Sequence, residues 1–328
     1  MKAVYIKQFG GTENLEIRDV PGPPKPRGSD VLVRVRAAGV NRADLLQRKG
    51  LYPGPEGYDP HRPGLEFAGE VADVGEGVVG WRTGDRVMAI TAGEAQAEFV
   101  SADASLLIRI PDNLSFAKAA AIPEAFITAH DAIWAQGGLK DGETLLVHAV
   151  GSGVGLAALQ MAKAKNVMVI GTSRTQGKLD AAAEFGLDHA IAVAGTPAFS
   201  GQVAELTGGR GADVILDLVG GSYFRENLKS LASRGRLLLV GLTGGASAEI
   251  DLRLALQKRA TIIGTVLRSR SLAEKAEAAR SFAEQMMEHF VDGTIEPVID
   301  KVFPASEAAA AHEYLASNET FGKVVLEF

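Results

Sequence analysis

The stretch Thr144–Lys165, TLLVHAVGSGVGLAALQMAKAK, constrains the fold more than any other part of the chain. Its first part, TLLVHAV, is a short apolar run typical of a fully buried strand. The glycine-rich GSGVG follows directly, and the sequence then changes to helix-forming residues with an apolar stripe. A second strand-like run, VMVIGTS, comes next. This order predicts a strand, a glycine turn, a helix and a parallel strand, which together form a βαβ unit.

The glycine turn is also a candidate phosphate-binding site. Glycine lets the backbone approach a pyrophosphate closely, and the N-terminus of the following helix offers free N–H groups and positive dipole charge. The spacing departs from the usual G-x-G-x-x-G pattern, because Val150, Ser152 and Gly155 occupy the three glycine places. A tight strand-to-helix connection without a ligand is the alternative interpretation of this turn.

The alternation of strand and helix patterns continues from about residue 123 to residue 268. It predicts a doubly wound parallel sheet with strand order 3-2-1-4-5-6 and a ligand at the carboxyl ends of the strands. The turns GTSR, DLVGG and VGLTGG each end a predicted strand. We therefore expect these turns to lie at the same edge of the sheet as GSGVG.

The flanking parts of the chain show a different pattern. Residues 1–122 contain short strand-like runs between loops rich in proline and glycine, which is typical of a barrel-like β domain. Residues 269–328 contain a long amphipathic helix, a strand, a helix that Ser306 is expected to cap, and a final strand KVVLEF. We predict an α/β chain in which 269–328 complete the first domain, 123–268 form an inserted dinucleotide-binding domain, and the substrate binds between the two.

Composition excludes several classes of protein. The net charge is −6 over 328 residues and both signs are interspersed, which argues against a nucleic-acid or membrane-surface partner. No run of about 18 uncharged apolar residues predicts a membrane span. The start MKAVYIKQFGG lacks the apolar core of a signal peptide, and the chain has no cysteine. A disulfide, a thiolate metal site and a catalytic thiol are therefore excluded, and we expect a cytoplasmic protein.

Several longer motifs resemble one family. They are AAGVNRADLLQRKGLYP, GLEFAGEVADVG, AAAIPEAFITAHDAI, LLVHAVGSGVG, ILDLVGGSYF, VLRSRS and FGKVVLEF, which run from about residue 31 to the end of the chain. They are similar to zinc-free medium-chain dehydrogenases/reductases, namely the zeta-crystallin type of NADPH:quinone oxidoreductase. The spelling of HAVGSGVG, NRADLLQR and GSYF is closest to the tumour-suppressor-inducible subgroup. The resemblance implies a GroES-like β-barrel catalytic domain, a Rossmann domain, and a homodimer or tetramer in which two sheets join across a two-fold axis.

The ligands needed for zinc are missing from the sequence. Zinc-dependent relatives have a cysteine at the place of Asn41 and a histidine before Glu66, where this chain has Leu65. His61 and Glu66 alone are too few, since a zinc site needs at least three protein ligands. We therefore expect no metal and interpret Glu66 as a structural partner in the β domain. Without a Lewis acid, the expected chemistry is hydride transfer to an activated acceptor such as a quinone or a conjugated enone.

The end of the second strand is expected to determine the choice of cofactor. NAD sites usually have an acid there that binds the ribose 2′-OH, and VIGTSRTQGK has none. The segment offers hydroxyls and cations that suit a 2′-phosphate: Ser173, Arg174, Thr175 and Lys178. The family has a lysine that matches Lys178, and it often has a tyrosine near Val193 that is missing here, so Arg174 is expected to replace it. NADP(H) is therefore the expected cofactor, and a solvated helix start with a stray arginine is the alternative.

The resemblance also implies which residues surround the nicotinamide. Asn41, Tyr52 and Thr128 are expected to line the nicotinamide and ribose, and these three are our candidate catalytic residues. Tyr52 either covers the nicotinamide or stacks on a flat acceptor, and the alternative is a loop tyrosine packed on the β domain. Ser152 either binds a pyrophosphate oxygen or caps the helix. The cofactor-binding candidates are Asn41, Thr128, Ser152, Gly153, Val154, Gly155, Ser173, Arg174, Thr175, Lys178, Gly241, Leu242, Leu267, Arg268 and Asn318.

No side chain is identified as a general acid from the sequence. His148 falls within a predicted strand and His130 on a predicted helix, and both are interpreted as structural. A reduced quinone can take protons from water, so a dedicated acid is not required. The expected function is NADPH-dependent reduction of quinones without a metal. The alternatives are reduction of the carbon–carbon double bond of enones and a non-catalytic role as an NADPH-binding redox sensor.

Overall fold

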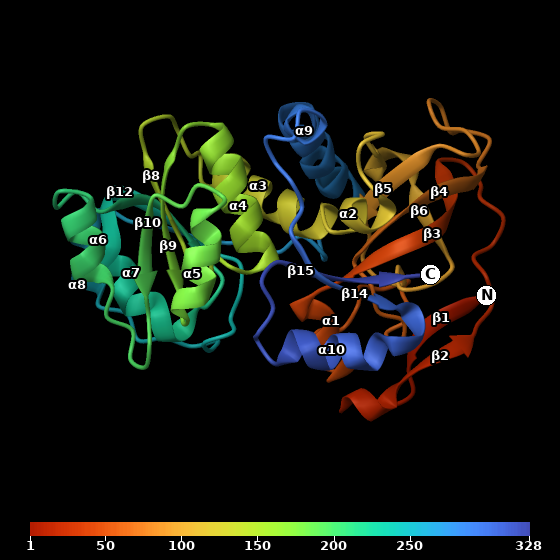
Figure 1. Cartoon of the computed structure of the whole chain (residues 1–328), viewed down its shortest axis with the longest axis horizontal. Helices are drawn as coiled ribbons and strands as arrows, with labels where there is room; N and C mark the ends of the chain where they lie inside the picture. Colours follow the sequence, from red (N-terminus) through yellow and green to blue (C-terminus); the bar gives the residue numbers. More distant parts are fainter. The chain divides into compact units, whose positions relative to one another are not determined.

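The computed structural model describes all 328 residues and divides them into two compact units (Figure 1). The first unit consists of Met1–Ile127 and Leu267–Phe328, and the second consists of Thr128–Val266. The sequence-based boundaries were placed after residues 122 and 268, whereas the units of the structure meet after residues 127 and 266. As a result, Glu124 and Arg268 belong to the first unit. No helix in the chain has the length and apolar character needed to cross a membrane.

The first unit is built on a seven-stranded mixed sheet with the order β14-β15-β3-β4-β5-β7, in which β6 also pairs with β3. Its strands are β3 (Asp30–Val40), β4 (Glu66–Val74), β5 (Arg86–Ile90), β6 (Phe99–Asp103), β7 (Ile108–Arg109), β14 (Ile299–Pro304) and β15 (Lys323–Glu327). Strand β3 is long, so β4 pairs along one side of it while β6 and β15 pair with its two halves on the other side. Strands β1 (Lys2–Ile6) and β2 (Leu15–Asp19) form a separate antiparallel pair.

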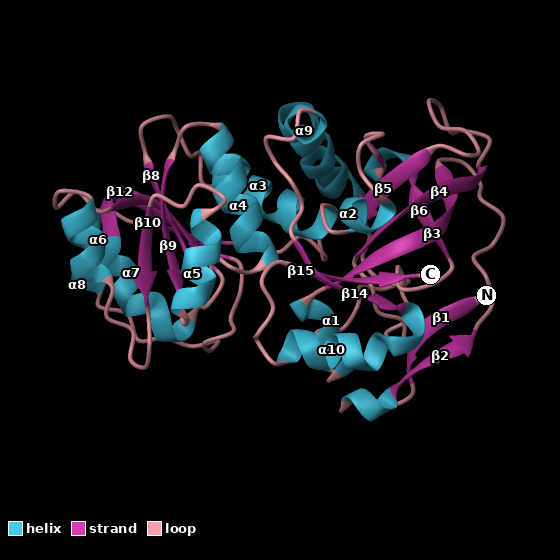
Figure 2. Ribbon diagram, in the orientation of Figure 1, coloured by secondary structure: helices cyan, strands magenta, loops and turns pink.

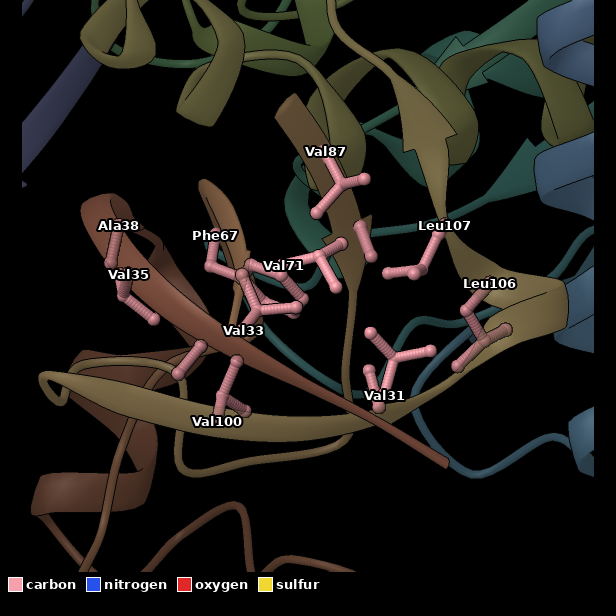
Figure 3. Packing of buried hydrophobic residues seen from close by; sticks show 13 residues of the cluster. Val31, Val33, Val35, Ala38, Phe67, Val71, Val87, Val100, Leu106 and Leu107 are labelled. Atoms are coloured by element: carbon pink, nitrogen blue, oxygen red, sulfur yellow. The ribbon is translucent and has the colours of Figure 1, made fainter. Parts of the chain in front are cut away.

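The core of this sheet follows from the period-two pattern of its strands. Val31, Val33 and Val35 alternate along β3 and point to one face, where they meet Phe67 from β4 and Val87 from β5 (Figure 3). All five side chains are buried. Side chains of an extended strand point alternately to opposite faces, and β-branched residues pack well on a pleated surface. The period-two pattern of the strand runs therefore specifies which face of the sheet is buried.

The helices of the first unit are α1 (Arg42–Arg48), α2 (Phe116–Ala120), α9 (Leu272–Val291) and α10 (Ala308–Ala316), with a π-helical turn η3 (Pro123–Ile127) and the 3₁₀ turns η1 (Thr12–Asn14), η2 (Ala104–Leu106) and η6 (Ala305–Glu307). The long amphipathic helix is confirmed as α9. It begins with a capping box in which the Ser271 hydroxyl and the Glu274 carboxylate each accept a backbone N–H of the other residue. The prediction that Ser306 caps α10 is wrong, because Ser306 lies inside η6 and Glu307 precedes the helix.

The second unit is a six-stranded parallel sheet with the order β10-β9-β8-β11-β12-β13, which confirms the predicted order 3-2-1-4-5-6. Figure 2 shows strands of this sheet in magenta with helices of the unit in cyan beside them. Its strands are β8 (Thr144–Val147), β9 (Met168–Ser173), β10 (His189–Ala192), β11 (Ala212–Asp217), β12 (Leu231–Leu239) and β13 (Thr261–Gly264). Its helical elements are α3 (Thr128–His130), η4 (Asp131–Gln136), α4 (Gly153–Ala164), α5 (Gln176–Ala183), α6 (Ser200–Leu206), η5 (Gly221–Tyr223), α7 (Phe224–Ser230) and α8 (Leu252–Lys258).

Candidate active site

In the second unit, the predicted cofactor-binding turns follow the carboxyl ends of neighbouring strands. Strands β9, β8, β11 and β12 are consecutive in the sheet and all run parallel. The carboxyl ends of parallel strands lie at one edge, and ligands bind outside that edge in doubly wound sheets. Ser152 to Gly155 run from the loop after β8 into the start of α4, and Ser173 to Lys178 run from the end of β9 into α5. Gly241 and Leu242 lie in the loop after β12. The sheet therefore brings these candidates to the same edge.

The N-terminus of α4 has the features of a pyrophosphate site. Ser152 precedes the helix, and its Oγ accepts the N–H of Gly155 at 3.1 Å, so Ser152 caps the helix and keeps its hydroxyl proton available to donate. The N–H groups of Gly153 and Val154 lie in the first turn, where no intrahelical acceptor exists. A Cβ at Gly155 would lie 2.5 Å from the carbonyl oxygen of Ala149. Only glycine therefore lets the helix begin this close to the strand, and this cradle fits a dinucleotide pyrophosphate.

The loop after β9 presents cations at the surface. Ser173 is buried at the strand end, whereas Arg174 and Thr175 are exposed and Thr175 precedes α5. Burial raises the pKa of the Tyr223 phenol, and the charge of Arg174 opposes that rise. Val193, the place of the missing tyrosine, is buried in the core of this unit. Arg174 is therefore exposed outside the core, at the edge where the ligand is expected.

A buried hydrogen-bond network connects the carboxyl ends of β8, β9 and β11. His148 contacts the hydroxyl of Thr172 through Nδ1 at 2.8 Å and the side-chain oxygen of Asn227 through Nε2 at 2.6 Å. Asn227 in turn donates to Asp217, which also accepts the backbone N–H of Gly220. Burial lowers the pKa of His148 to about 4, so the imidazole is neutral, with Nε2 donating and Nδ1 accepting. His148 is thus a fully bonded structural residue that ties β8, β9 and β11 together.

In the first unit, the buried ion pair of Glu66 and Lys323 and the side chain of Asn41 connect three strands. Glu66 begins β4, Lys323 begins β15 and Asn41 follows β3. The ammonium of Lys323 lies 2.6 Å from Oε1 of Glu66 and 2.5 Å from Oδ1 of Asn41, and Nδ2 of Asn41 donates to the same Glu66 oxygen at 2.8 Å. Glu66 is 0% exposed and Lys323 6% exposed. The interpretation of Glu66 as a structural partner is therefore correct.

The same three residues fix the orientation of the Asn41 amide. Its oxygen faces an ammonium and its nitrogen faces a carboxylate, so the reversed orientation would place donor against donor and acceptor against acceptor. A Cβ at Gly39 would lie 2.0 Å from the Glu66 carboxylate, so glycine is needed for this packing. One N–H of Asn41 Nδ2 remains for a ligand. No three histidine, cysteine, aspartate or glutamate side chains gather in a way that would hold a metal ion.

Arg268 fastens the loop that contains Tyr52. Its guanidinium donates to the carbonyl oxygens of Ala92 at 2.7 Å and Tyr52 at 3.0 Å, and to Oε1 of Gln47 at 2.6 Å. It also lies over the Tyr52 ring, with its central carbon 4.9 Å from the ring centroid. Burial raises the pKa of Tyr52, so the phenol stays protonated at neutral pH. Arg268 therefore has three protein partners within the first unit, and its role toward a cofactor remains a prediction.

A second acid, Glu124, lies beside the ion pair of Glu66 and Lys323. The backbone N–H of Glu124, in η3, donates to Oε2 of Glu66 at 2.8 Å. The half-buried carboxyl of Glu124 has no hydrogen-bond or ion-pair partner of its own. Burial, followed by the charge of Glu66, raises its pKa to about 8. This carboxyl is therefore mostly protonated at neutral pH.

The predicted nicotinamide residues are divided between the two units. Asn41, Tyr52 and Arg268 lie in the first unit, and Thr128 is half-buried at the start of α3 in the second. Among the remaining candidates, Leu267 is buried, and exposed Asn318 accepts a hydrogen bond from the Arg42 guanidinium.

Glu124 and Lys323 were not among the site residues predicted from the sequence. The signals were present, because each is a charged residue in an apolar run, namely AAAIPEAFI and KVVLEF. A charge in such a run is expected to be paired or functional once the run is buried.

Comparison with known proteins agrees with this architecture. Residues 27–128 match the alcohol dehydrogenase GroES-like domain, and residues 153–285 match the zinc-binding dehydrogenase domain. A curated quinone oxidoreductase of Pseudomonas aeruginosa is 35% identical over 327 residues, covering 99% of each chain. The solved structure of mycobacterial Rv1454c complexed with NADPH is 32% identical with a TM-score of 0.90 and full coverage of both chains. The JamJ enoyl reductase is 27% identical with a TM-score of 0.88, covering 99% of this chain and 98% of its own.

These similarities extend over the whole chain and both units. The Gly155 cradle, the parallel sheet and the mixed β sheet are the parts that a nicotinamide-dependent oxidoreductase of this architecture requires. The chain is an oxidoreductase that belongs to the quinone oxidoreductase type of the medium-chain dehydrogenase/reductase family.

Proposed function

We propose that this protein reduces quinones with NADPH and without a metal ion. The observation that carries the proposal is the buried group of Lys323, Glu66 and Asn41. The ammonium of Lys323 neutralises the carboxylate of Glu66 and donates hydrogen bonds to Glu66 and Asn41. These residues stand at the place where zinc-dependent relatives have metal ligands. An ammonium that is already bonded to two side chains does not polarise an alcohol as a metal would. The acceptor must therefore be activated by its own structure, as a quinone is.

The residues of the second unit are suited to hold the cofactor. The N–H groups of Gly153 and Val154 and the hydroxyl of Ser152 bind the pyrophosphate, and Arg174 with Lys178 binds the 2′-phosphate. When bound, the reduced nicotinamide supplies a hydride to the acceptor.

In the first unit, Asn41 and Tyr52 provide contacts for the nicotinamide end and the acceptor. The free N–H of Asn41 is suited to a sugar hydroxyl or the carboxamide. The ring of Tyr52 offers a flat surface for a planar quinone, and Arg268 holds the loop backbone. Catalysis then depends on positioning and on exclusion of water, with the acceptor atom held about 3–3.5 Å from the nicotinamide carbon.

Steady-state rates on a panel of acceptors test this function. With NADPH, ortho-quinones, para-quinones and conjugated enones are compared at equal concentrations, with and without a metal chelator. The proposal expects the highest kcat/KM on a quinone and no effect of the chelator. Reduction of enones alone would favour the second candidate function, which the similarity to an enoyl reductase supports. NADPH binding without reduction of any acceptor would leave a redox sensor as the function.

Two substitutions at Tyr52 test its role in binding the acceptor. Tyr52→Ala should lower kcat/KM on planar ortho-quinones about 3- to 10-fold, because stacking contributes about 0.5–1.5 kcal/mol. Tyr52→Phe should behave almost like the parent, since the ring rather than the hydroxyl is proposed to act. If Tyr52→Phe is as damaging as Tyr52→Ala, the hydroxyl is a proton donor or an essential hydrogen-bonding group and the stacking role is wrong.

We further propose that the protein forms a homodimer, or a tetramer built from such dimers, through the edge strand β13. This strand pairs only with β12, and Ile262 on it is exposed, as are Leu252 and Leu256 on α8. An unpaired edge with apolar neighbours favours pairing with a second copy. Light scattering at micromolar concentration should give at least twice the mass of one chain, and Ile262→Asp should give one chain mass. A monomeric parent protein would contradict this proposal.

A further inference from the structure

The acidic side chains around Asn41 differ in how many hydrogen-bond partners their carboxyl oxygens have. Asp44 is fully buried and both of its oxygens accept backbone N–H groups, from Asn41 and Gly64. Glu66 is fully buried and accepts three hydrogen bonds, one of them from Lys323. Neither carboxylate is accessible for proton exchange with a ligand. The carboxyl of Glu124 is half-buried and has no bonded partner, so it alone is available.

We propose that Glu124 is the proton donor of this active site, giving its carboxyl proton to the acceptor that receives the hydride. The inference rests on the proposed function, because it requires an acceptor bound beside Asn41 and Tyr52. The backbone N–H of Glu124 donates to Oε2 of Glu66 at 2.8 Å, and Oε1 of the same Glu66 accepts Nδ2 of Asn41 at 2.8 Å, so one carboxylate joins Glu124 to Asn41. Glu124 is therefore beside the residues that hold Asn41, which is proposed to contact the nicotinamide end.

The step is balanced in atoms and electrons. A hydride brings one proton and two electrons to the acceptor, which is left with one negative charge on an oxygen or on the carbon next to a carbonyl. The O–H bond of the Glu124 carboxyl breaks, and a new O–H or C–H bond forms on the acceptor. Glu124 is left as a carboxylate and takes a proton from water before the next turnover. The sum consumes one reduced cofactor and one solvent proton for each acceptor reduced.

The charges around Glu124 stabilise both its protonated form before the proton transfer and its carboxylate form after it. Charged or titratable groups face Glu124 from the strands, helices and loops packed around it: Glu66 of β4, Asp44 of α1, Tyr52 of its loop, Arg268, Lys275 of α9 and Lys323 of β15. The two acids favour the protonated form of Glu124 before the step, whereas the three cations stabilise the carboxylate left after it. The pKa of about 8 follows from this balance and from burial, and it keeps the acid protonated at neutral pH.

The contribution of this donor depends on the acceptor. A reduced quinone carries its charge on oxygen and can take a proton from water, whereas the carbanion-like carbon of a reduced enone exchanges protons slowly with water. Glu124 should therefore matter most for acceptors that form a new C–H bond. This extends the substrate class of the site to conjugated enones in addition to quinones.

The test compares Glu124→Gln with the parent on an ortho-quinone and on a conjugated enone. The variant should lose about 100-fold in kcat on the enone, as expected for a lost general acid, and less than about 10-fold on the quinone. The parent rate on the enone should fall as the pH rises through about 8, and the variant should lack this step. Glu56→Gln is the matched control, since Glu56 is exposed on the Tyr52 loop, and it should match the parent.

Two measurements separate this inference from other causes of lost activity. NADPH affinity by fluorescence should be unchanged in Glu124→Gln, which excludes a folding defect. The infrared difference between parent and Glu124→Gln should contain a protonated-carboxyl band at pH 7, and that band should disappear as the pH rises through about 8. Equal losses on both acceptors, or an unchanged pH profile in the variant, would overturn the inference. A parent protein that reduces no acceptor would instead contradict the proposed function, while the infrared result still reports whether Glu124 holds the proton.

Discussion

Replacing Lys323 with methionine is expected to lower the free energy of unfolding by about 3–5 kcal/mol. Lys323 neutralises Glu66 at a site where neither residue has appreciable contact with water. Methionine keeps the length of the side chain but leaves the Glu66 carboxylate buried beside Asn41 without its cation. A buried charge that has lost its partner is strongly destabilising, because solvation cannot replace the lost attraction. The midpoint of urea denaturation measures the loss.

An exposed ion pair provides the matched control for this prediction. Arg280 on α9 pairs with Glu277 and Glu284, and all three side chains are well exposed. Arg280→Met should therefore move the urea midpoint only slightly, since water screens such pairs. Adding Glu66→Gln to Lys323→Met should recover part of the lost stability, because the lone charge is then removed. If Lys323→Met behaves like Arg280→Met, the pair does not carry the stability that its burial implies.

The ion pair of Lys323 and Glu66 also positions Asn41, a candidate cofactor-binding residue. Lys323 and Glu66 together hold the Asn41 amide in one orientation, so the free N–H of Asn41 points in a fixed direction. Lys323→Arg keeps the charge but changes the shape of the donor, and it should retain most of the stability while altering the position of the amide. A structural role alone would leave the cofactor affinity of that variant unchanged, whereas a positioning role would lower it. Isothermal titration with NADPH distinguishes the two.

The second unit could be predicted because its information is local. Each strand, turn and helix leaves its own pattern, and the order 3-2-1-4-5-6 is the usual one for a doubly wound sheet with right-handed connections. The third glycine place of the turn was recognised as Gly155, and the structure gives the physical reason, namely the close approach to the carbonyl of Ala149.

The ion pair of the first unit could not be predicted in the same way. Its members stand at positions 41, 66 and 323, and only the pairing of β3 with both β4 and β15 brings them together. Sequence spacing contains no sign of such a contact. The same applies to Arg268, whose protein partners Gln47, Tyr52 and Ala92 lie more than 170 positions earlier in the chain.

Replacing Arg174 with alanine is expected to raise the KM for NADPH about 10- to 100-fold. A charge-assisted hydrogen bond to a phosphate contributes about 1.5–3 kcal/mol, and each 1.4 kcal/mol is a factor of about ten. Arg174 is exposed beside the end of β9 and next to Thr175, and no acid stands in this loop to bind a ribose hydroxyl instead. NADH lacks the phosphate that Arg174 is proposed to bind, so its KM should remain nearly unchanged. Initial rates with both cofactors at saturating acceptor give the comparison.

Arg174→Lys and the salt dependence separate binding of the phosphate from support of the loop. Lysine keeps the charge but loses the planar fork that matches two phosphate oxygens, so this variant should fall between the parent and Arg174→Ala. Raising the ionic strength should weaken NADPH binding in the parent more than in Arg174→Ala, since screening acts on the charge that the substitution removes. Equal losses with NADPH and NADH in Arg174→Ala would mean that the residue supports the turn between β9 and α5. The preference for NADPH would then have to come from elsewhere in the site.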